Sequence, residues 1–107
     1  MPKLKTDKFR SARGGHSRLL QISCAKCGHH VLRYQKDGPG SLKRMYFDRI
    51  HAPEELVGLQ HHDLKGIPVL SCRGCTRMIA VPYLYREEQR KAFRVFQDAV
   101  TKKVIKM

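Results

Sequence analysis

The chain has few acidic residues, no tryptophan and no long apolar run. Its 107 residues include 9 Asp and Glu against 22 Lys and Arg. A membrane-spanning helix needs about 20 consecutive apolar residues, and no segment approaches that length, so we expect no membrane partner. The start of the sequence also lacks the apolar stretch of a signal peptide. We therefore expect a cytoplasmic protein, with the mitochondrial matrix or another organelle as the alternative.

Motifs typical of catalysis are missing as well. The sequence has no P-loop, no H-E-x-x-H and no Ser/His/Asp arrangement. Its carboxylates are few and scattered, which leaves little for general acid–base chemistry or for a magnesium site. We therefore expect a protein that is not an enzyme and that has no small-molecule substrate.

The four cysteines form two pairs of identical internal spacing, Cys24/Cys27 and Cys72/Cys75. A C-x-x-C step can place two thiolates on one metal, and two such steps supply the four sulfur ligands that tetrahedral Zn²⁺ prefers. Each pair is accompanied by a glycine, Gly28 or Gly74, that suits a tight turn with unusual dihedrals. The pattern predicts one structural Zn²⁺ held by all four cysteines.

Other interpretations of the cysteines stay open. An iron or iron–sulfur centre uses the same ligands, so spacing does not separate it from zinc. His29 could replace one cysteine. Disulfides need an oxidising compartment, and a thioredoxin-like C-x-x-C normally occurs once, ahead of a helix. These two points count against disulfides and a thioredoxin-like site. A redox or metal-transfer protein still remains as a third functional alternative.

Short apolar segments flank both cysteine pairs. Residues 19–22 and 31–35 are predicted strands around the first pair, and residues 69–71 and 78–81 around the second. Each set makes a hairpin with the cysteine turn, or zinc knuckle, at its tip. Residues 42–50 are predicted as a further strand. A turn at 37–40 would join it to 31–35 as a second, basic hairpin.

The end of the chain shows a helical pattern. Phe93, Phe96, Val100 and Val104 recur at i, i+3, i+7 and i+11, which predicts an amphipathic helix over residues 86–106. Its remaining face is rich in lysine and arginine. We expect its apolar stripe to pack on the cysteine module.

By its two knuckles with flanking strands, the chain resembles the zinc-ribbon group of ribosomal proteins, transcription factors and RNA polymerase subunits. The resemblance covers roughly residues 19–81 and implies that the metal is structural. The 44 residues between the pairs exceed the commoner spacing of 15–20, which indicates an insertion.

These patterns together predict a small metal-bound α+β fold with zinc-ribbon-like antiparallel β hairpins plus one C-terminal α-helix. We expect a basic flexible arm over residues 1–18. A zinc-ribbon-like β module with an inserted basic hairpin would follow over 19–85, with the basic helix over 86–107 packed on it.

The charge balance indicates a polyanionic partner. A formal net charge of +13 and a pI near 10.1 favour nucleic acid, because neutralised phosphates release counterions. Cations interleaved with aromatic residues, as over residues 33–49, are typical of proteins that bind looped RNA. We expect base stacking on Tyr34 or Tyr46.

The leading hypothesis is a zinc-stabilised protein that binds structured RNA rather than DNA, as a ribosomal protein or ribosome-associated factor within a larger ribonucleoprotein. The candidate contact residues are Lys3, Lys5, Lys8, Arg10, Arg13, Arg18, Arg33, Tyr34, Lys36, Lys43, Arg44, Arg49, Arg73 and Arg77. The second hypothesis is a protein–protein adaptor in a transcription complex, which would use the knuckles and the apolar stripe of the predicted helix.

Overall fold

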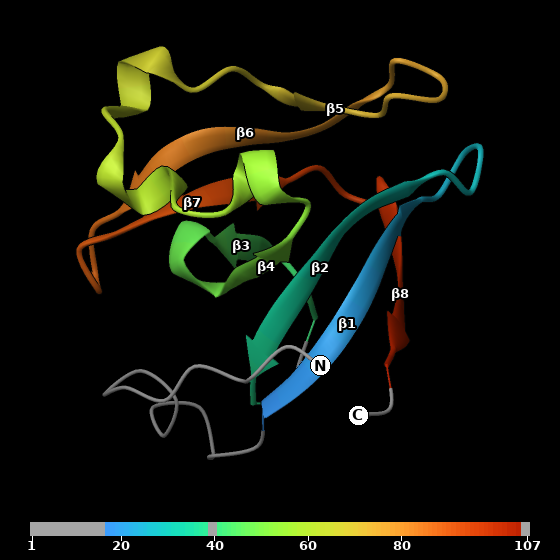
Figure 1. The fold of residues 1–107 in the computed structure, drawn as a ribbon, viewed down its shortest axis with the longest axis horizontal. Helices are drawn as coiled ribbons and strands as arrows, with labels where there is room; N and C mark the ends of the chain where they lie inside the picture. The colour runs from blue at the N-terminus through green and yellow to red at the C-terminus, as the bar shows by residue number, and fades with distance from the viewer. Residues whose placement is uncertain (1–16, 39–40, 106–107) are drawn as a thin grey trace.

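The computed structural model describes residues 17–38 and 41–105, which form two antiparallel sheets of four strands each (Figure 1). The first sheet has the order β4-β2-β1-β8 and the second the order β3-β7-β6-β5. The first contains β1 (Ser17–Cys24), β2 (His30–Asp37), β4 (Ile50–Ala52) and β8 (Val100–Val104). The second contains β3 (Arg44–Tyr46), β5 (Leu70–Ser71), β6 (Met78–Tyr85) and β7 (Arg90–Val95). No helix in these residues is long and apolar enough to cross a membrane.

The two predicted cysteine hairpins are confirmed. β1 pairs with β2 and β5 pairs with β6, both antiparallel. In the first hairpin the side chains alternate between two faces, as a strand requires. Leu20, Ile22 and Leu32 enter the core between the sheets, whereas Gln21 and Arg33 lie opposite each other on the outer face.

The predicted strand over residues 42–50 is broken in the structure. It consists of β3, the 3₁₀ helix η1 (Phe47–Arg49) and β4. β3 pairs with β7 in the second sheet, whereas β4 pairs with β2 in the first. Phe47 lies in the core, and the centroid of its ring is 4.7 Å from the ring centroid of Phe93. The chain therefore crosses from one sheet to the other at η1, and only β4 pairs with β2.

Three further 3₁₀ helices connect β4 to β5. They are η2 (Glu54–Leu56), η3 (Leu59–His61) and η4 (Leu64–Gly66). Gly58 precedes η3 in the left-handed region, with φ of +88°, a conformation that costs glycine less than other residues. This connection places the second cysteine pair beside the first.

The predicted C-terminal helix is wrong, and with it the α+β fold class. Residues 90–95 form β7 and residues 100–104 form β8, with turns at 86–89 and 97–98, so the described chain is mostly antiparallel β. The apolar stripe does not exist. Phe93 is 1% exposed in the core, but Phe96 is 42% and Val104 49% exposed. The adaptor hypothesis therefore loses one of the two surfaces on which it depended, the apolar stripe, and keeps the knuckles.

Two residues in the left-handed region mark the turns that stand where the helix was predicted. Gln89 has φ of +51° and Asp98 has φ of +60°, each in a turn, and such a residue ends a right-handed helix. The segments that follow contain β-branched residues that suit strands. β8 then gains hydrogen-bonded pairing with β1, from Leu20↔Val104 to Cys24↔Val100.

The predicted segment boundaries also change. β1 begins at Ser17, inside the predicted arm, and residues 1–16 of that arm lie outside the described residues. Residues 90–95 belong to the second sheet and residues 100–104 to the first. The C-terminal segment is thus an integral part of both sheets.

Candidate metal centre and basic surface

The first knuckle is a tight turn closed by two backbone hydrogen bonds. The N–H of Cys24 donates to the carbonyl of His29, and the N–H of Gly28 donates to the carbonyl of Cys24, both at 2.8 Å. Gly28 has φ of +78°. The prediction that this glycine supplies an unusual dihedral is confirmed.

The second knuckle repeats the same turn. The N–H of Cys72 donates to the carbonyl of Arg77 and the N–H of Thr76 to the carbonyl of Cys72, again at 2.8 Å. Thr76, with φ of +64°, occupies the place of Gly28. The predicted turn role of Gly74 is therefore taken by a threonine.

Gly74 instead lets the two knuckles approach each other. A Cβ at this position would lie 3.0 Å from His29 Cβ and 3.2 Å from Cys27 Sγ. Both neighbours belong to the opposite knuckle, and one is a sulfur of the cluster. Only glycine fits here without moving that sulfur.

We expect Gly74→Ala to weaken zinc binding about tenfold. Overpacking of this kind costs about 1–3 kcal/mol, and 1.4 kcal/mol is a factor of ten. The matched control is Gly66→Ala, where no atom lies within 4 Å of the added Cβ. Competition with a chromophoric chelator measures both affinities. Equal affinities for the two variants would contradict this role of Gly74.

The tips of the β1–β2 and β5–β6 hairpins lie near each other (Figure 1), and the four cysteine sulfurs converge there. All four lie within 4.8 Å of one another. Cys24 Sγ is 3.7 Å from Cys75 Sγ, and Cys27 Sγ is 3.5 Å from Cys72 Sγ. These separations are too long for a disulfide bond of about 2.05 Å. They match the edge of about 3.8 Å that four sulfurs 2.3 Å from a tetrahedral Zn²⁺ would have.

Backbone N–H groups favour thiolates at the first cysteine of each knuckle. The N–H of Cys27, with that of Lys26, lowers the pKa of Cys24 to about 6. The N–H groups of Cys75 and Gly74 likewise lower the pKa of Cys72, and the Gly74 nitrogen lies 3.3 Å from Cys72 Sγ. A cation that binds here displaces fewer protons than it would from ordinary thiols.

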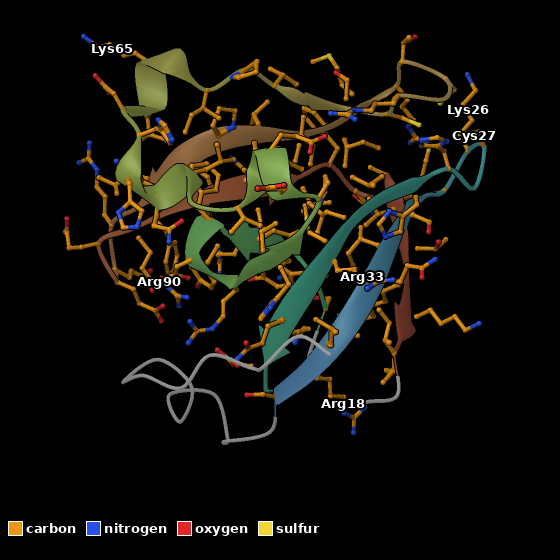
Figure 2. All side chains as sticks on the ribbon, in the orientation of Figure 1. Arg18, Lys26, Cys27, Arg33, Lys65 and Arg90 are labelled. Atoms are coloured by element: carbon orange, nitrogen blue, oxygen red, sulfur yellow. The ribbon has the colours of Figure 1, made fainter. Side chains whose placement is uncertain are left out.

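The pKa of Cys27 shifts in the opposite direction from that of Cys72. The N–H of His29 lowers the pKa of Cys27, but the hydrogen bond with Cys72 and burial outweigh it and raise that pKa to about 11. Cys24 and Cys72 are buried, whereas Cys27 is exposed at the outer end of the first knuckle (Figure 2). A metal ion would thus enter from the side of Cys27.

The cluster is compatible with a zinc site of four cysteines. Among the described residues, the group close enough to bind one ion contains these four cysteines and no histidine, so His29 is not needed as a ligand. Four soft sulfur donors at tetrahedral spacing fit Zn²⁺.

The structure divides the predicted nucleic-acid contacts into several groups. Lys3, Lys5, Lys8, Arg10 and Arg13 lie outside the described residues. Arg18, Arg33 and Lys43 are exposed, and Lys36, Arg44 and Arg77 are partly buried. Arg73 is exposed but forms an ion pair with Glu55.

Two of the predicted contacts are core residues in this structure. Arg49 is 1% exposed, and its Nε donates to Asp37 Oδ2 at 2.8 Å. Tyr34 is 3% exposed, and its hydroxyl accepts the N–H of Tyr46 at 2.9 Å. Burial raises the pKa of Tyr34. Tyr46 is buried too, beneath Arg90, whose guanidinium carbon lies 3.6 Å from its ring centroid. None of these side chains faces solvent.

A group of arginine and tyrosine side chains on the second sheet was not predicted from the sequence. Arg44 lies directly opposite Arg94, and Tyr83 and Tyr85 follow two residues apart on β6. The period-2 pattern of Val81, Tyr83 and Tyr85 was a signal for this face. Because residues 86–106 were predicted as a helix, β7 was not recognised as the strand that pairs with β6.

Comparisons with protein-family models, with curated proteins and with solved structures find no match to this chain.

Proposed function

We propose that this protein binds structured RNA, as a ribosomal protein or a ribosome-associated factor, with a structural zinc ion that holds its two sheets together. Binding is its role rather than catalysis, because four cysteines would fill every ligand position of tetrahedral zinc and leave none for a reacting water.

The observation that carries the proposal is the distribution of charge. Three of the carboxylates form ion pairs with buried arginines. Asp37 pairs with Arg49, and both Asp48 and Glu88 pair with Arg90. These acids do not neutralise the surface.

Eight exposed cations, in contrast, have no carboxylate within ion-pair distance among the described residues. They are Arg18, Lys26, Arg33, Lys43, Lys65, Arg86, Arg94 and Lys103. A surface with this excess of one charge attracts phosphate-rich partners and holds them through counterion release.

The outer face of the first sheet offers a row of such groups. Arg33 on β2 and Lys103 on β8 flank Gln21 on the central strand β1. Neighbouring strands are about 4.8 Å apart, so the two cations stand about 10 Å apart on a rigid sheet. They can contact phosphates of one RNA segment without a conformational change.

RNA is favoured over duplex DNA by the kind of surface offered. The described residues contain no α-helix to enter a major groove. Strand faces and loops with cations and aromatic rings are the usual means of binding loops and single strands of RNA.

We expect Arg33→Glu and Lys103→Glu each to weaken binding of an RNA hairpin with a single-stranded loop. Each loses one phosphate contact, so the slope of log K against log salt should fall by about one. Lys65→Glu is the matched control. It makes the same charge change on η4, well away from Arg33 (Figure 2).

Fluorescence anisotropy of labelled RNA over a range of salt concentrations measures affinity and slope together. Wild-type binding that does not change between low and physiological salt would contradict the proposal. An equal loss in Lys65→Glu would show that only net charge matters and would contradict the assigned row.

A further inference from the structure

The face of the second sheet that points away from the core combines arginines and tyrosines from three strands. Met45 on β3 and Phe93 on β7 are paired and enter the core. Side chains alternate along a strand, so the neighbouring pair Arg44↔Arg94 points to the opposite face. β6 continues this face, because Arg94 pairs with Val81 and Ala92 with Tyr83. β3, β7 and β6 lie side by side in Figure 1.

The positive charges of Arg44 and Arg94 are directly opposite each other on this face. Like charges in such a cross-strand pair destabilise a sheet. Arg94 is exposed, and neither Arg44 nor Arg94 has an ion pair with a carboxylate among the described residues. An anion between the two guanidinium groups would remove the repulsion and accept hydrogen bonds from both.

Arg44 is already held in position for such a contact. Its Nε donates to the hydroxyl oxygen of Tyr83 at 3.1 Å, and its guanidinium carbon lies 4.1 Å from the centroid of the Tyr85 ring. The hydroxyl of Tyr85 in turn donates to Glu87 at 2.6 Å. A side chain fixed in this way loses little entropy on binding a ligand.

The tyrosines provide rings beside the two charges. Tyr83 and Tyr85 are partly exposed, unlike Tyr34 and Tyr46. Bases stack on such rings whatever their sequence. Phosphate and base are the two parts of a nucleotide, and this face has a group for each.

Next to Arg44 lies a cavity whose lining includes two further cations, Lys36 and Lys43. The cavity, of about 120 Å³, is lined by Lys36, Lys43 and Arg44, with Ser41, Leu42, Tyr34, Tyr46 and Asp37. Asp37 is the acid of this cavity, and it is already paired with Arg49. A nucleic-acid backbone that leaves the arginine pair would therefore meet further positive charge.

We infer that this face binds single-stranded RNA, with one phosphate between Arg44 and Arg94, a base stacked on Tyr83 and the next phosphate at the cavity lined by Lys36 and Lys43. The inference rests on the proposed RNA binding and assigns it a strand type and a site.

The test compares a labelled 12-nucleotide single-stranded RNA with a blunt RNA duplex of the same length, by anisotropy at constant salt. We expect Arg94→Glu to weaken single-strand binding at least tenfold. Tyr83→Leu should weaken it about tenfold, within the range for loss of one stacked base, and leave duplex binding unchanged. Lys65→Glu, with the same charge change as Arg94→Glu, should have a small effect on both.

The outcomes separate this site from RNA binding in general. If the wild type binds neither RNA, the proposed function fails. If the wild type binds RNA and Arg94→Glu and Lys65→Glu behave alike, the function stands and this site is wrong. Equal effects of Tyr83→Leu on single strand and duplex also overturn the site, because stacking on a free base requires a single strand. Zinc content and thermal unfolding confirm that each variant is folded.

Discussion

Removal of the metal is expected to lower the melting temperature of this protein by about 15 °C or more. The four sulfurs lie where the tips of two hairpins from different sheets meet, so an ion bound to all four would crosslink the two layers of the fold. A ligand present at a thousand times its dissociation constant stabilises the folded state by about 4 kcal/mol. In a domain of about 100 residues, 1 kcal/mol corresponds to about 4–8 °C. Thermal unfolding followed by circular dichroism, with and without a strong chelator, measures the effect.

Cys72→Ser is the matching variant, and it should melt near the temperature of the chelated wild type. Cys72 is buried, so the substitution also changes packing. The chelator separates the two effects, because it should not destabilise the variant further if the variant no longer holds metal. A chelated wild type that melts at its original temperature would contradict a structural role for the ion.

The cysteine hairpins could be predicted because their signal is local. A C-x-x-C turn and its flanking apolar residues lie close together in sequence, and one bound ion would take its ligands from both turns. The role of Gly74 could not be predicted in this way. Its neighbours, Cys27 and His29, are more than forty residues away in sequence, so only the folded arrangement shows why no Cβ fits.

The C-terminal strands were not predictable from periodicity alone. Phe93, Phe96, Val100 and Val104 fit one helical stripe, but Phe93 and Val100 fit two strands joined by a turn equally well. Long-range pairing, of β8 with β1 and of β7 with β3, decides between helix and strands. A local sequence pattern contains no information about such pairing. The arginine and tyrosine face of the second sheet depends on the same pairing and was missed for the same reason.

Replacement of Arg49 by methionine is expected to lower the free energy of unfolding by about 3–5 kcal/mol at neutral pH. Arg49 and Asp37 are both buried, with Arg49 Nε 2.8 Å from Asp37 Oδ2. Removal of one partner leaves a buried charge without its counter-ion, which costs about this much. Arg73→Met removes an arginine from an exposed pair with Glu55 and should cost about 1 kcal/mol or less. Urea denaturation compares the two variants directly.

The loss of unfolding free energy caused by Arg49→Met should be larger at neutral pH than at acidic pH. Burial alone would raise the pKa of Asp37, but hydrogen bonds from Ser17, Arg49 and Gln35 outweigh it and hold that pKa below its ordinary value. A carboxyl group with a lowered pKa stabilises the folded state above its unfolded pKa of about 3.9. That contribution is lost as the pH falls through the folded pKa.

In Arg49→Met the pKa of Asp37 rises, so the carboxyl group takes up its proton at a higher pH than in the wild type. The difference in unfolding free energy between wild type and variant should therefore be largest at pH 7 and smaller at pH 3. The double variant Asp37→Asn/Arg49→Met, which leaves no unpaired buried charge, should recover part of the loss at pH 7. An equal difference at both pH values, with no recovery in the double variant, would mean that Arg49 stabilises the fold through packing rather than through its charge.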